Sequence, residues 1–121
     1  MLVYDLAHQL AREIRQSEQY RQLRQAKEKV SQNPGARSML EDLQKQQLAL
    51  QQALLQGESI PEEKRERIEE MGRIVAANPT VTEYRVAELA LVRLMGDVEK
   101  ILWDGVQDAL LVEPFSADRE G

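Results

Sequence analysis

Apolar side chains recur every three or four positions through most of this chain, which is the spacing of one face of an α-helix. No window shows the alternation of apolar and polar residues, enriched in β-branched and aromatic side chains, that is typical of a half-buried strand. The pattern therefore predicts an all-α protein, built as helical hairpins or a bundle of about five helices. These helices are expected over residues 3–15, 17–31, 34–56, 61–77 and 79–112.

Two of the predicted helices begin in the same way, with asparagine followed by proline. Asn33 and Asn78 can each cap a helix whose first residue is Pro34 or Pro79, because proline has no N–H and its φ already suits a helix start. The two asparagines lie 45 positions apart, and a shorter helix precedes each of them. This repetition is either a diverged internal duplication or the chance recurrence of a common helix start. In either case it indicates two helical hairpins rather than a solenoid.

The other expected boundaries depend on glycine, serine and proline. Gly57 can end the third helix, Ser59 can cap the fourth, and Pro61 then stands at its beginning. We expect one helical domain over residues 1–113, since 121 residues are close to the usual size of a single domain. Residues 114–121 are expected to form a flexible tail.

The last predicted helix is the longest and carries two apolar stripes. A helix on the surface of a monomer needs one apolar face about 100° wide, and this helix would extend ~50 Å, more than the width of a compact domain of this size. We therefore expect an intertwined homo-oligomer, most simply an antiparallel two-fold dimer. Trp103 could lie in the core or anchor a partner. The residues expected in the core or the oligomer contact are Tyr84, Leu91, Leu94, Val98, Ile101, Leu102 and Trp103.

Composition narrows the function classes. Only 4% of the residues are aromatic. None is cysteine, so the chain has no thiol that could form a disulfide, act as a nucleophile or bind a metal. The longest apolar run is far shorter than the ~20 residues of a membrane helix, and the first residues lack the pattern of a signal peptide. We expect a cytoplasmic protein that does not contact a membrane.

Residue types that carry catalysis are sparse. His8 is the single histidine, and no second histidine is available to complete a metal site with it. The glycines are isolated, so no phosphate-binding loop is formed, and no serine stands in a recognisable nucleophile pattern. The sequence predicts that the chain is not an enzyme and holds no cofactor or metal.

Charge is distributed unevenly along the chain. The formal net charge is −5, yet the first 37 residues are basic and the rest is acidic. Clustered arginines can bind phosphates, but few aromatic rings are near enough to stack on bases. We expect this basic segment to contact protein, either the acidic part of the chain or a partner, with direct RNA binding as the lesser alternative. The candidate interaction face comprises Arg12, Arg15, Arg21, Arg24, Gln44, Gln47 and Gln51.

Several segments together resemble the YlbF/YmcA family. The resemblance covers nearly all of residues 3–110 and consists of helix caps and regularly spaced leucines rather than a catalytic signature. It is carried by residues 3–11, 17–21, 26–30 and 43–48, by the two Asn-Pro starts, and by Val81, Tyr84, Ala87 and Glu88.

The resemblance implies a small all-α bacterial cytoplasmic protein that associates with itself. Some members of this family act in a complex that modulates competence, sporulation and biofilm formation by directing an endoribonuclease in messenger RNA maturation. Those members carry cysteines linked to iron–sulfur binding, and this chain has none. It is therefore more similar to the YheA-like branch, and the cluster-binding role is not carried over.

Three functions are consistent with these observations. The first is a non-enzymatic adaptor or regulatory protein that contacts a family relative or an endoribonuclease. The second is an RNA-binding helical module that uses the basic N-terminal face. The third is a structural homo-oligomer without a specific ligand.

Overall fold

The structure is a computed structural model that describes residues 2–112. Between these residues it contains five α-helices and no strand, so the all-α prediction is confirmed. The helices are α1 (Leu2–Arg15), α2 (Glu18–Ser31), α3 (Pro34–Leu55), α4 (Glu62–Ala76) and α5 (Pro79–Val106), and a short 3₁₀ turn, η1 (Gln107–Ala109), follows α5.

The two Asn-Pro starts form as predicted. The Asn33 side-chain oxygen accepts a hydrogen bond from the Ala36 N–H at 3.1 Å, and the Asn78 side-chain oxygen accepts one from the Val81 N–H at 3.1 Å. Each bond satisfies a backbone donor that the first turn of a helix leaves without a partner. Both helices therefore begin at the proline because the preceding asparagine caps them.

In the turn between α3 and α4, the end of α3 agrees with the prediction from sequence and the start of α4 differs from it. Gly57 has φ +74°, and the N–H groups of Gly57 and Glu58 donate to the carbonyls of Leu54 and Ala53, which is the glycine-dependent helix ending. The prediction that Ser59 caps α4 is wrong. Pro61 occupies the cap position and no side chain bonds to the first turn, where Glu62 and Glu63 place negative charge instead.

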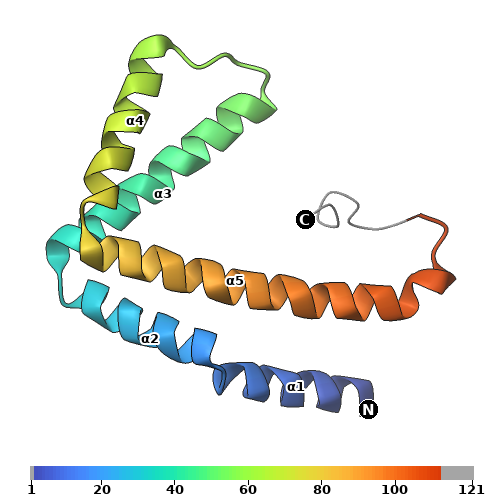
Figure 1. Ribbon diagram of the computed structural model, residues 1–121. Helices are drawn as coiled ribbons and strands as arrows, with labels where there is room; N and C mark the ends of the chain where they lie inside the picture. Colours follow the sequence, from blue (N-terminus) through green and yellow to red (C-terminus); the bar gives the residue numbers. More distant parts are fainter. Residues whose placement is uncertain (1, 113–121) are drawn as a thin grey trace.

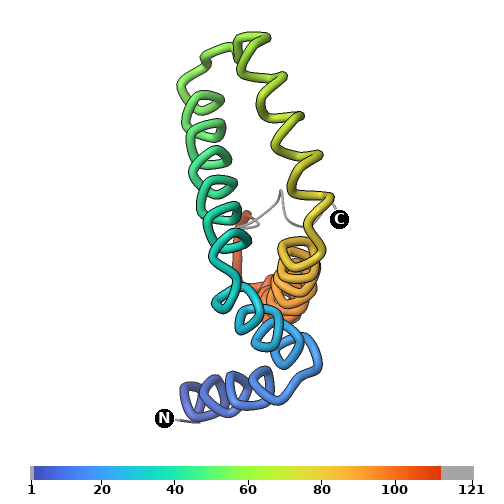
Figure 2. Tube along the Cα trace, turned by 90° about the vertical axis from the view of Figure 1, so that its left-hand side faces the viewer, coloured from blue at the N-terminus to red at the C-terminus, as the bar shows by residue number. Residues whose placement is uncertain are grey.

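The helices meet at one hub. Figure 1 shows the end of α2, the start of α3, the end of α4 and the start of α5 converging there. From the hub, α5 runs back antiparallel to α2, while α3 and α4 form a second antiparallel pair that opens away from the hub (Figures 1 and 2). The structure thus consists of two helical pairs joined at the Asn-Pro starts.

The buried core is small and centred on this hub. Ala36, Val75 and Val81 are each at most 2% exposed and form one cluster. A second buried set, Ala26, Val30 and Ala87, comes from α2 and α5, which pack along each other. Small side chains fill these places because helices can approach closely only where the residues between them are short. Met39, Leu40, Leu43 and Met71 pack around the cluster.

The last helix is shorter than predicted. It ends at Val106 and is followed by η1, whereas the periodicity predicted helix to residue 112. Beyond η1, Leu111 and Val112 are almost fully exposed within the described residues. Since packing supplies most of a helix's stability, these residues do not continue the helix. The predicted tail, 114–121, lies outside the described residues.

Candidate interaction surfaces

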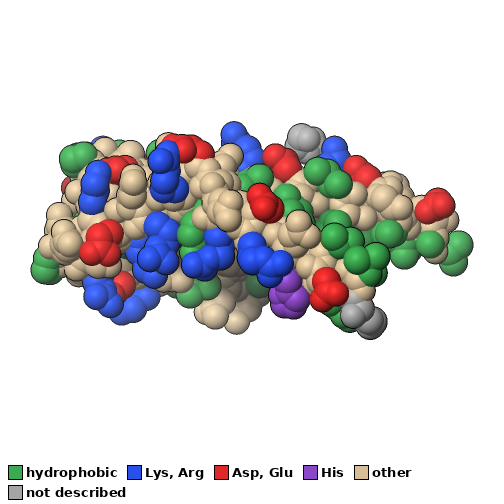
Figure 3. All heavy atoms as spheres, turned by 90° about the horizontal axis from the view of Figure 1, so that it is seen from below, with side chains coloured by type: hydrophobic (Ala, Val, Ile, Leu, Met, Phe, Trp, Pro, Cys, Tyr) green, Lys and Arg blue, Asp and Glu red, His purple; other side chains and the backbone are tan. Residues whose placement is uncertain are grey.

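The four arginines of the predicted interaction face lie on two consecutive helices. Arg12 and Arg15 stand in the last turn of α1, and Arg21 and Arg24 in the first half of α2, and all four are exposed. Figure 3, a view onto the α1 and α2 side, shows basic side chains gathered over this part of the molecule. We refer to these four residues as the basic face.

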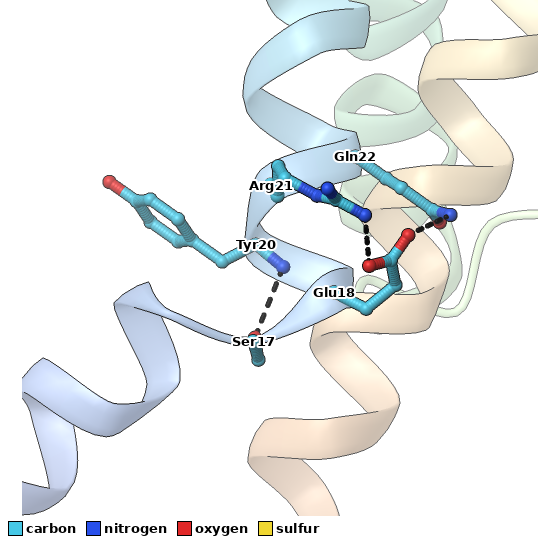
Figure 4. A network of polar contacts seen from close by, with 5 residues as sticks. All are labelled: Ser17, Glu18, Tyr20, Arg21 and Gln22. Carbon is cyan, nitrogen blue, oxygen red and sulfur yellow. Dashed lines mark hydrogen bonds and ion pairs between the residues drawn. The ribbon is translucent and has the colours of Figure 1, made fainter.

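Two of these arginines have partners within the chain. The Arg21 guanidinium pairs with Glu18, which also accepts a hydrogen bond from Gln22 at 3.0 Å (Figure 4). The Arg15 guanidinium lies 5.2 Å from the centre of the Tyr20 ring, a cation–π distance. These contacts occur where the Ser17 hydroxyl caps α2 by accepting from the Tyr20 N–H (Figure 4).

The other two arginines are available to a partner. Within residues 2–112, Arg12 and Arg24 form no ion pair. An exposed cation without a carboxylate neighbour loses little on binding an anionic surface, because no existing pair has to break. The basic face therefore contains two cations that can be tested separately from the local network around Ser17.

The three glutamines of the predicted face are not joined to the basic face. Gln44 and Gln47 on α3 line an open cleft of about 490 Å³ where α2, α3 and α5 approach one another near the hub, which we call the hub cleft. Gln51 is exposed one turn further along α3 and does not line this cleft. None of the four arginines of the basic face lines it either, so the predicted surface is divided in two.

Sequence reasoning missed most of the charged residues that line the hub cleft. Lys27, Arg37 and Arg85 come from three helices, and Glu41 and Glu88 lie among them. Arg37 also forms an ion pair with Glu41 at 3.3 Å. A usable signal was present, since Arg37 and Arg85 each follow an Asn-Pro start by about one or two turns. Because the two starts meet at the hub, these arginines reach the same cleft.

Tyr84 lies in the wall of the hub cleft. Its hydroxyl donates a hydrogen bond to the Glu88 carboxylate at 3.4 Å. Partial burial raises the pKa of Tyr84, and the neighbouring Glu88 charge raises it further. The phenol therefore stays neutral at physiological pH and acts as a hydrogen-bond donor in the wall of the cleft.

The apolar residues predicted for the core or the oligomer contact divide into two groups. Tyr84, Leu91, Leu94, Val98 and Trp103 are half-buried on α5, which packs along α2. Ile101 and Leu102 are 70% and 59% exposed. The first four residues of the half-buried group share the helix face that α2 covers, whereas α2 begins only at Glu18 and does not reach the last turns of α5.

Part of α5 and most of α1 remain uncovered. The second apolar stripe of α5 is exposed, from Leu89 to Val106. No residue of α1 is buried, although its apolar residues follow one helix face. These exposed stripes are larger than the scattered apolar residues of an ordinary surface.

Residues 2–112 contain no group of three or more histidine or carboxylate side chains placed to hold a metal ion. Over the same residues, no helix is both long and apolar enough to cross a bilayer.

Comparison with known proteins shows the family by sequence. A family model described as "Control of competence regulator ComK, YlbF/YmcA" matches residues 3–107. A UPF0342 protein of Halothermothrix orenii is 39% identical over 107 residues, covering 88% of this chain and 91% of the relative. Another, from Caldicellulosiruptor saccharolyticus, is 31% identical over 104 residues, covering 86% and 87%.

A solved structure has the same fold. It is titled "Protein of Unknown Function (DUF964) from Bacillus stearothermophilus", superposes with a TM-score of 0.77 at 23% identity, and is matched over 95% of its length and 89% of this chain. The family model over residues 3–107 and the sequence relatives show that the chain belongs to the YlbF/YmcA family, which is linked to control of competence.

Proposed function

We propose that this protein is a non-enzymatic regulatory adaptor, which acts by binding another protein through the basic face. The observation that carries the proposal is the pair Arg12 and Arg24, two exposed cations without an ion pair in the described part of an otherwise acidic chain. The family's link to competence regulation supports a regulatory role rather than a reaction. The expected partners are a family relative or an endoribonuclease, met in the cytoplasm.

An RNA-binding module using the same arginines is the second candidate. Proteins that recognise single-stranded RNA rely on aromatic side chains on which the bases stack. Tyr20 is the aromatic residue on α2, and the Arg15 guanidinium already lies over its ring. Base stacking on Tyr20 would have to displace this contact, which makes protein the favoured partner.

Affinity capture with a charge-reversal pair tests the proposal. The tagged wild-type protein, the double variant R12E/R24E and a control K64E/R65E are used to capture partners from native extract, with and without nuclease. Lys64 and Arg65 are exposed on α4 and form no ion pair within the described residues, so the control changes the same charge elsewhere. Partner recovery is measured by quantitative mass spectrometry.

The adaptor role predicts a partner that survives nuclease and binds about tenfold or more weakly to R12E/R24E, which corresponds to ~1.4 kcal/mol. Binding to K64E/R65E should match wild type. A partner lost on nuclease treatment would move the conclusion to RNA binding. Capture of nothing but further copies of the chain would contradict both and favour a structural homo-oligomer.

We also propose that the working form is a homo-oligomer. The support is the amount of apolar surface that a single copy leaves exposed on α1 and α5.

A further inference from the structure

We infer that a second copy of this chain packs against two apolar surfaces at one end of the molecule, one on α1 and one on the last turns of α5, so that the α1 stripe of each copy is covered by its partner. We call these two surfaces together the seam. This inference rests on the proposed self-association and names its surface. The residues of the seam are Val3, Leu6 and Leu10 on α1 and Ile101, Leu102 and Val106 on α5.

The exposure of α1 supports this contact. It is a 14-residue helix in which no residue is buried, and its seam residues Val3 and Leu6 are 74% and 54% exposed. Isolated helices of this length are marginal in water, because packing of the apolar face supplies most of their stability. The partner that stabilises α1 must therefore be present whenever the chain is folded, which suits a second copy better than a transient client.

The accessible surface of the chain also supports this contact. The chain has 9839 Å² of accessible surface at 13.9 kDa, whereas a compact monomer of this mass has about 6,700 Å². Ten residues outside the described range account for at most about 1,700 Å² of the difference, even fully extended. Roughly 1,500 Å² per copy is left over, which matches the area that each subunit buries in a permanent homodimer.

The uncovered residues of α1 and of the last turns of α5 lie at the same end of the molecule. Figure 1 places α1 at the same end of the molecule as the last turns of α5, and Figure 3 shows hydrophobic side chains gathered at that end. A patch of this size at one end can pack against its own two-fold copy, since an isologous contact uses the same surface twice. The α3–α4 pair, at the opposite side of the hub, is not part of it.

The test compares variants of the seam with a matched pair outside it. Light scattering is measured for wild type, L6E/L10E, L102E/V106E and the control L48E/L55E. Protein concentrations run from about 1 to about 100 µM, which is of the order of typical dimer dissociation constants. Leu48 and Leu55 are exposed apolar residues of α3. Wild type and control should have about twice the 13.9 kDa mass of one chain, and each seam variant should raise the dimer dissociation constant by about a hundredfold or more, since symmetry introduces every charge twice.

Hydrogen exchange on unaltered protein provides a second readout that does not depend on variant folding. Amide protection in α1 should increase with protein concentration, while protection in α2, which packs on α5, should not. A monomeric wild type would overturn both the self-association and the seam. The seam alone would be overturned if L48E/L55E dissociated the dimer and the seam variants did not. It would also be overturned if amide protection in α1 did not depend on protein concentration. Partner capture through the basic face would be unaffected in either case.

Discussion

Ala36 and Val81 occupy matching positions in two different helices and are buried in one cluster. Each is the third residue after a capping asparagine, each is 0% exposed, and the 45-residue offset that relates them also relates Val30 to Val75, which are both buried. The two Asn-Pro starts therefore do more than begin helices, since they bring the first turns of α3 and α5 together. The fold depends on this hub because few other described residues are buried.

Enlarging Ala36 should destabilise the protein. Ala36→Leu adds three carbon atoms where Val75 and Val81 already fill the space, and overpacking of this kind costs about 1–3 kcal/mol. Ala49→Leu is the control, because Ala49 is exposed on the same helix and should change stability by less than about 0.5 kcal/mol. Urea unfolding measures both variants, and equal stabilities would contradict the buried hub.

The asparagine caps at the starts of α3 and α5 should contribute similar amounts to the stability of the protein. Asn33→Ala and Asn78→Ala each remove a 3.1 Å bond to the first turn, with an expected loss of about 1 kcal/mol apiece. Serine at either position retains a cap and should restore most of the loss. Thermal unfolding followed by circular dichroism gives the comparison, and an alanine variant as stable as wild type would refute the capping role.

Replacing glycine by alanine should change the free energy of unfolding in opposite directions at Gly57 and Gly72. Gly57→Ala forces a side chain into a left-handed backbone conformation at φ +74° and should cost about 1–2 kcal/mol. Gly72→Ala, within α4 and with no atom within 4 Å of the added Cβ, should instead stabilise the protein by up to about 1 kcal/mol. Denaturant midpoints of the two variants on opposite sides of wild type would confirm the assignment, and the same sign for both would refute it.

Tyr84 should titrate above the ordinary tyrosine. Burial and Glu88 both raise the pKa of Tyr84, so the absorbance change of the phenolate should occur at higher pH than for the unfolded chain at about 10. Because the folded state favours the neutral phenol, the associated stability is complete below pH ~10 and decreases as pH rises through the folded pKa. Glu88→Gln should lower that pKa only in part, since burial is the larger cause.

Much of the secondary structure follows from residues that are neighbours in sequence. A cap such as Asn78 with Val81, or the Gly57 ending, involves atoms three to five residues apart, and such contacts exist in any arrangement of the helices. The helix starts at Pro34 and Pro79 could therefore be predicted with the correct residues. The failures, at Ser59 and at the end of α5, occur where a local preference had a competing residue or lacked packing to support it.

Contacts between distant residues could not be predicted in this way. Nothing local places Lys29 beside Glu83, 54 positions away, or brings Gln44 and Arg85 to one cleft while leaving Gln51 outside it. Apolar periodicity likewise showed that α5 has two stripes, but not that α2 covers one and leaves the other exposed. Local hydrogen bonds and side-chain spacing thus set the helices, whereas the surfaces available to partners were decided by packing, because burial depends on which distant face arrives opposite each stripe.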